Sequence, residues 1–143
     1  MLRQTDPDQN FRIRSENRAE GLALLLRGEA EILITYETPQ SPCHVPEPLA
    51  VRQLLGQDAL VLVASPALHR NLRRVAEGGA VPLLCYPPDS FFGQALRTEV
   101  LPEMMRRQQV VVRCVSEFAM GLRELALVDQ GVAWLPASLI QDD

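Results

Sequence analysis

The sequence predicts an α/β protein built on mainly parallel sheets. Runs of apolar and β-branched residues typical of strands alternate with segments of helical spacing along most of the chain. Its 143 residues are enough for one core or two small lobes, and 47% hydrophobic with 22% charged residues is ordinary for a folded protein. We therefore expect a compact α/β architecture and not a disordered or fibrous chain.

The first half predicts one β-α-β unit. Phe11–Arg14 alternates apolar and polar residues, which is typical of a half-buried strand. Asn17 followed by Glu20 predicts a helix N-cap, and Gly28 predicts the end of that helix. Glu31–Tyr36 predicts the next strand, and a right-handed crossover would place the two strands side by side in parallel.

Residues 37–48 carry four prolines and predict an irregular surface loop, followed by an extended crossover at 49–55. The second half then alternates strands with helices. Strands are expected at Leu60–Val63, Val81–Tyr86, Val110–Val115 and Val132–Leu135. Helices are expected over Pro66–Ala76, with closure at Gly78-Gly79, and from Ser116 to near Gly131, with Phe118 among the apolar positions. Another helix is expected from Asp89-Ser90, and Pro102 either interrupts it or re-initiates it around residues 104–108.

Charge and hydropathy exclude several classes of function. A net charge of -4, with arginines scattered along the chain and no lysine, argues against DNA binding by these residues, because neutralising phosphates needs clustered cations. We also expect no membrane association and no export signal, since the apolar runs are short and no basic-then-apolar N-terminal pattern is present. A cytoplasmic location is the corresponding expectation.

The three cysteines predict neither a disulfide framework nor a metal site. Cys43-His44 lacks the spacing that lets two ligands reach one ion, and His69 lies on another element. Cys85 and Cys114 lie in apolar strands, where a thiolate is disfavoured, so they are expected to be small buried residues and not nucleophiles. No cofactor is expected.

Three segments carry a resemblance to a known family. Leu25–Tyr36 joins a helix end, a glycine and an acidic entry to an apolar strand, and Asp129–Pro136 contains Gly-Val-Ala-Trp-Leu-Pro. Leu60–His69 is the third segment. Together they resemble the effector-binding domain of LysR-type transcriptional regulators. The resemblance covers roughly Phe11 to Asp143 and implies two lobes, like those of type 2 periplasmic binding proteins, facing each other across an effector cleft.

Within that family, the segments 82–86, 89–93 and 131–136 look most like regulators that respond to hypochlorite. In that subgroup, methionines of the effector domain are thought to sense the oxidant. Two of those positions hold Phe92 and Phe118 here, which puts the oxidant-sensing mechanism in doubt. Met104, Met105 and Met120 are open to oxidation if exposed, but methionine at helical spacing more often fills a core.

The resemblance also implies that the first lobe is incomplete. Relative to the family pattern, the sequence lacks a helix-turn-helix, a linker helix, the first strand and helix of the effector domain, and the final return crossover. We expect residues 1–10 to be a disordered lead-in, 11–58 a partial first lobe and 59–143 the second lobe. Uncovered sheet edges predict self-association, as a dimer or larger. DNA would be bound only through a helix-turn-helix domain absent from these residues.

The candidate ligand-binding residues lie where strands end and helices begin. Ligands of parallel sheets bind at the carboxyl ends of strands, where helix N-termini present N–H groups to an anion. Asp89, Ser90 and Phe91 follow one such strand and Ser116 another. Asn17, followed by Arg18, is a third helix start, from the other lobe. Ser90, Ser116 and Asn17 are also the residue types that cap helices, so capping and ligand contact both stay open.

The sequence therefore predicts the effector-sensing domain of a LysR-type transcription factor, which binds a small, anionic molecule in an interlobe cleft. No catalytic residues are expected, because no acid, base and nucleophile are brought together by a motif. The alternatives are a solute-binding protein or an enzyme of the same two-lobed fold. An upstream helix-turn-helix would identify the regulator, whereas a signal peptide would identify the solute-binding protein.

Overall fold

The computed structural model describes residues 10–46, 48–75 and 79–140. The chain divides into two compact units, Met1–Val51 and Arg52–Asp143, and each is described by itself. Within the described ranges, no helix is both long and apolar enough to cross a membrane.

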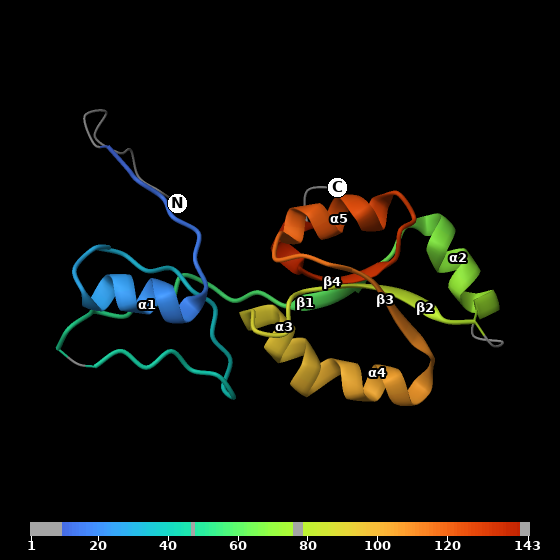
Figure 1. Cartoon of the computed structure of the whole chain (residues 1–143), viewed down its shortest axis with the longest axis horizontal. Helices are drawn as coiled ribbons and strands as arrows, with labels where there is room; N and C mark the ends of the chain where they lie inside the picture. Colours follow the sequence, from blue (N-terminus) through green and yellow to red (C-terminus); the bar gives the residue numbers. More distant parts are fainter. Residues whose placement is uncertain (1–9, 47, 76–78, 141–143) are drawn as a thin grey trace. The chain divides into compact units, whose positions relative to one another are not determined.

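The described part of the first unit contains one helix, α1 (Arg18–Leu26) (Figure 1). The backbone N–H of Glu20 donates to Asn17 Oδ1 over 2.9 Å, which confirms Asn17 as the N-cap. Gly28 follows the helix with φ +72°, a left-handed conformation that costs glycine little. The predicted start and end of this helix are therefore both confirmed.

The prediction of a strand on either side of α1 is wrong. Phe11–Arg14 and residues 31–36 form no ladder in the described part of the chain, and the bridge recorded in this unit joins Thr38 to Ser41. Ile32 and Ile34 are 78% and 75% exposed. A strand needs a hydrogen-bonded neighbour, so the alternating pattern here produces an extended segment without a sheet.

The second unit is a four-stranded sheet in the order β1-β4-β2-β3 (Figure 1). The strands are β1 (Leu60–Val63), β2 (Val81–Cys85), β3 (Val110–Val115) and β4 (Val132–Pro136). All four were predicted. β2 is parallel to β3 and β4, whereas β1 pairs antiparallel with β4, so the sheet is mixed but mostly parallel.

Helices cover both faces of this sheet. They are α2 (Pro66–Val75), α3 (Phe91–Ala95), a π-helical segment (Leu96–Val100), α4 (Leu101–Arg107), α5 (Ala119–Leu127) and a final 3-10 turn (Ala137–Leu139). Figure 1 shows α5 on one side of the sheet and α4 on the other. Accordingly, Leu122 of α5 belongs to one buried cluster with Leu84 and Leu135, and Met104 of α4 to another with Leu83. The predicted closure of α2 at Gly78 lies outside the described residues.

Of the two effects predicted for Pro102, an interruption of the helix is wrong, whereas a new start agrees with α4, which has Pro102 in its first turn. The chain stays helical from Phe91 to Arg107, with the π-helical segment immediately before α4. Proline has no backbone N–H to donate to the preceding turn. The N–H of Leu101 donates instead to Leu96 O, five residues back, which is the hydrogen bond of a π-turn. The wider turn thus accommodates the proline without a break.

The helix after β3 begins later than predicted. Ser116 is not its N-cap, because its backbone N–H donates to Cys85 O over 2.9 Å and so extends the contact with β2. The N-cap is Phe118, which is 67% exposed and not one of the buried helical positions. Ser116 still supports the turn, since its Oγ accepts from the N–H of Phe118 over 3.1 Å.

Ser65 joins the start of α2 to the end of α5. It is 5% exposed, and its Oγ accepts from the N–H of Leu68 over 3.0 Å while its hydroxyl donates to the Asp129 carboxylate. Asp129 adopts φ +65°, in the left-handed region that aspartate tolerates better than most residues. Pro66 follows Ser65 as the first helical residue, a preferred position for proline.

We expect Ser65→Ala to lower the free energy of unfolding by about 1–2 kcal/mol, because it removes both a helix cap and a buried hydrogen bond. Urea denaturation followed by circular dichroism measures this change. The matched control is Ser138→Ala, since Ser138 is exposed and bonds Asp58 over 2.6 Å. An equal change in both variants would contradict the role assigned to Ser65.

Candidate functional site

The candidate site lies at the carboxyl edge of the parallel pair β2 and β3. The carboxyl ends of parallel neighbours meet at one edge, and the hydrogen bond from Ser116 N–H to Cys85 O fixes the two chain ends beside each other. Asp89, Ser90 and Phe91 follow β2 after a short turn. The structure thus brings these three residues and Ser116 to the same edge of the sheet.

Ser90 is the N-cap of α3, as predicted. Its Oγ accepts from the N–H of Gly93 over 3.0 Å, and its hydroxyl donates to Pro87 O over 2.7 Å. A β-carbon at Gly93 would lie 1.8 Å from Pro87 O, so the turn closes only around glycine. The hydroxyl of Ser90 is therefore part of the turn, and a ligand here would compete with Pro87 for it.

Aromatic side chains support the turn. Tyr86 is 5% exposed and its ring centroid lies 5.2 Å from that of Phe92, which in turn lies 5.9 Å from that of Phe91. These distances are typical of favourable tilted and edge-to-face pairs. The sequence analysis missed Tyr86 as part of this site, although an aromatic residue directly after a buried strand and before two prolines was the available signal.

The charges at this edge are acidic. Asp89 is exposed after β2, and Glu117 is exposed after β3. Burial raises the pKa of the Cys85 thiol above its ordinary value, so the thiol at the end of β2 stays neutral at physiological pH. An anion at this edge would be bound by backbone N–H and hydroxyl groups against the repulsion of two nearby carboxylates.

Asn17 and Arg18 belong to the first unit, whereas Ser90 and Ser116 belong to the second. The side chain of Asn17 caps α1. The guanidinium of Arg18 donates to Ser41 O over 2.8 Å and to Ser41 Oγ over 2.6 Å. Arg18 therefore holds the proline-rich loop against the start of α1.

Apart from the neighbours Cys43 and His44, the cysteines and histidines lie on separate elements. Within the described ranges, no three side chains of histidine, cysteine, aspartate or glutamate gather around one point. Cys43, Cys85 and Cys114 are free thiols. Cys85 belongs to the cluster of Met104, whereas Cys114 packs against the cluster of Leu122 on the other face of the sheet. The prediction that both are small buried strand residues is confirmed for Cys85, whereas Cys114 is only partly buried.

The methionines and the tryptophan divide between core and surface. Met104 is 8% exposed and fills the core, whereas Met105 and Met120 are 56% and 41% exposed. Trp134 is partly buried and packs against both buried clusters. Among the methionines that the structure describes, Met105 and Met120 are the ones accessible to an oxidant.

Comparison with known proteins gives a family. The family model described as LysR substrate binding domain matches residues 1–143. No curated protein sequence matches the chain.

Solved structures share the fold. The regulatory domain of HypT from Salmonella typhimurium, in its apo form, superposes with a TM-score of 0.73 at 18% identity, covering 97% of this chain and 64% of that domain. Full-length HypT, a hypochlorite-specific LysR-type transcriptional regulator, gives 0.71 at 18% identity over 97% of this chain and 45% of that protein. The LysR family regulator VV2_1132 gives 0.58 at 17% identity, over 90% and 41% respectively. The chain thus spans less than two thirds of these structures.

Proposed function

This chain belongs to the LysR substrate-binding domain family, and we propose that it is the effector-sensing part of a LysR-type transcription factor. The observation that carries the proposal is the family match over residues 1–143. The fold shared with the regulatory domain of HypT supports it. On this proposal the domain acts in the cytoplasm, where it controls DNA-binding heads that these residues do not contain.

The proposed mechanism is a shift between domain arrangements that the effector binds unequally. A ligand changes such an equilibrium only by the difference between its affinities for the two states. The effector would lie in an interlobe cleft, at the edge that carries Asp89, Ser90, Phe91 and Ser116. On this proposal, Asn17 and Arg18 would face the effector from the first lobe. Arg18 would then have to release or share its hydrogen bonds with Ser41.

The effector we propose is a small anion or anionic metabolite. The helical run from Phe91 to Arg107 begins at this edge, and a helix start favours an anion by about 0.3–1 kcal/mol. The hydroxyl of Ser116 at the same edge is a second group that we propose contacts the anion. The HypT regulatory domain has been solved with bromide bound, which makes bromide a suitable first probe. The carboxylates of Asp89 and Glu117 would keep the affinity for a simple halide weak.

We propose that the domain works as a dimer or larger assembly. Ile13, Ile32 and Ile34 of the first unit are 92%, 78% and 75% exposed. In the described part of the second unit, β3 pairs on one side only, with β2, and its Val112 is 51% exposed. Exposed apolar residues and open strand edges are normally covered by a partner.

We therefore expect light scattering at micromolar concentration to give at least twice the monomer mass. Replacing Ile32 and Ile34 together by threonine removes exposed apolar surface and should shift the equilibrium toward the monomer. Replacing Val51, which is 99% exposed, by threonine serves as the control for a single exposed apolar side chain. A monomer over the whole concentration range would contradict self-association.

The reading frame upstream of Met1 in the genome tests the regulatory function. An in-frame helix-turn-helix segment supports a transcription factor. An export signal would instead identify a solute-binding protein of the same fold. Activity of the purified chain on a metabolite, lost in a site variant that stays folded, would identify an enzyme.

A further inference from the structure

Strand β3 forms one edge of the sheet in the second unit. In the order β1-β4-β2-β3 it has β2 on one side and, among the described residues, no strand on the other. Its sequence is a run of apolar residues that contains one charge, Arg113. Val111, Val112 and Val115 are between 48% and 54% exposed. An exposed apolar edge of this kind is a template on which another strand can pair.

Arg113 restricts which strand can pair there. Val112 and Cys114 are opposite consecutive residues of β2, so Arg113 between them is the extra residue of a β-bulge. Arg113 is exposed and forms no ion pair with a described residue. A bulge and a charge both oppose indiscriminate pairing at a sheet edge. A strand that adds to β3 is therefore favoured if it brings a carboxylate to Arg113.

The first unit contains an extended segment, residues 31–34, with the matching properties. Its backbone makes no hydrogen bond with a described residue. Ile32 and Ile34 are 78% and 75% exposed, whereas Leu33 is partly buried and lies against α1. Glu31 is exposed and forms no ion pair with a described residue. The segment thus offers a free strand edge, an uncovered apolar face and a carboxylate at one end.

The opposite charges determine how the two segments fit together. With Glu31 opposite Arg113, an antiparallel arrangement brings three apolar residues opposite three valines of β3: Ile32 with Val112, Leu33 with Val111, and Ile34 with Val110. A parallel arrangement would instead place Ile34 opposite Ser116, so it forms fewer apolar pairs. Apolar and opposite-charge pairs across neighbouring strands both stabilise a sheet. The antiparallel arrangement satisfies both.

We propose that residues 31–34 of one copy of this chain pair antiparallel with residues 110–113 of a second copy, with Glu31 opposite Arg113. The inference rests on the self-association put forward with the proposed function, and it names the two segments that meet. A contact between two β3 strands is disfavoured by comparison. Strand β3 contains no carboxylate, so that contact would bring two arginines together without a partner.

Charge reversal tests this pairing. Glu31→Arg and Arg113→Glu each place like charges opposite one another, so each should raise the dissociation constant of the assembly by about fivefold or more. Sedimentation equilibrium measures this constant. An equimolar mixture of the two variants should associate like the parent protein, because each new charge meets its opposite on the other variant. A contact within one chain would not be restored by mixing.

Matched controls make the same changes of charge elsewhere. Arg97→Glu and Glu99→Arg alter exposed residues of the π-helical segment, and both should leave the dissociation constant within about twofold of the parent value. Hydrogen exchange gives a second measurement. The amides of residues 31–34 should exchange more slowly as the protein concentration rises, and Glu31→Arg should remove this protection. Circular dichroism confirms that each variant is folded.

Three results would overturn the pairing: a dissociation constant that neither reversal changes, equal weakening by the two controls, or a mixture that does not associate like the parent. A parent protein that stays monomeric would overturn it together with self-association. The effector site is tested separately, by whether bromide binds at the β2–β3 edge. A failure of the strand pairing is therefore distinguishable from a failure of the proposed function.

Discussion

Leu122→Ala is expected to lower the free energy of unfolding of the second unit by about 2–5 kcal/mol. Leu122 is 0% exposed and packs in one cluster with Leu84, Ala133 and Leu135. Its truncation removes apolar contacts from α5 and leaves a void that strands β2 and β4 cannot close without moving. Because single domains are stable by only about 5–15 kcal/mol, the variant would be close to unfolding.

Leu127→Ala is the matched control, since it makes the same substitution in the same helix. Leu127 is 51% exposed, so its truncation should cost less than about 1 kcal/mol. Urea denaturation followed by circular dichroism compares the two. Similar midpoints for both variants would show that α5 does not pack on the sheet through Leu122.

Gly93→Ala is expected to destabilise the turn after β2 by about 2–4 kcal/mol, from the combined cost of overpacking and a lost cap. The new β-carbon would lie 1.8 Å from Pro87 O and 2.9 Å from Ser90 Oγ. Both atoms take part in the cap of α3, so the chain must move out of the turn. Ligand binding at Ser90 and Phe91 should be lost with it.

Gly56→Ala is the control for that substitution, because a β-carbon there meets no atom within 4 Å. Its effect on the free energy of unfolding should stay within about 0.5 kcal/mol. Thermal and urea denaturation of both variants measure the difference. If Gly93→Ala unfolds like the parent protein, the turn from Pro87 to Gly93 is not closed as described.

The strands of the second unit could be predicted because their signal is local. β3 carries a run of valines, and β2 and β4 are short apolar runs bounded by turn residues. The pairing of β1 could not be predicted in the same way. Alternating strands and helices suggest a parallel sheet throughout, and nothing within Leu60–Val63 indicates that this strand runs antiparallel to β4.

The first unit shows the limit of pattern reasoning. The alternation in residues 31–36 predicts the face of a strand, and Leu33 does lie near Gly21 of α1, where a β-carbon would come within 2.9 Å of Leu33 Cδ1. Strand formation, however, depends on a neighbouring strand. An incomplete first lobe leaves these residues without a neighbouring strand, so the ladder is absent.

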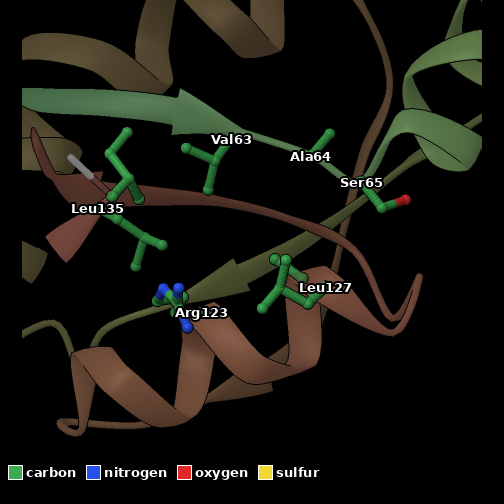
Figure 2. A pocket seen from close by; sticks show the side chains of 8 residues that line it. Val63, Ala64, Ser65, Arg123, Leu127 and Leu135 are labelled. Atoms are coloured by element: carbon green, nitrogen blue, oxygen red, sulfur yellow. The ribbon is translucent and has the colours of Figure 1, made fainter. Parts of the chain in front are cut away.

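For the candidate site, the sequence predicts which residue types cap helices, but not the backbone geometry around each of them. Asp89-Ser90 before an apolar helix indicates an N-cap, and Ser90 is one. Ser116 follows the same rule, yet its backbone stays with β2 and the helix begins two residues later. A small hollow beside Arg123 could not be predicted, because its lining comes from β1, α5 and β4, which only the tertiary fold brings together (Figure 2).

The central claim is that this domain senses a small anion at the β2–β3 edge, and a bromide titration followed by amide chemical shifts tests it most directly. The account predicts saturable shifts at residues 90–93 and 116–118. Ser90→Ala and Ser116→Ala should each weaken binding by roughly 0.5–1.5 kcal/mol, whereas Ser138→Ala should not. Chemical shifts that do not saturate, or that change at other residues, would contradict the account. So would bromide binding that is unchanged in both variants. The two serines would then have only a structural role.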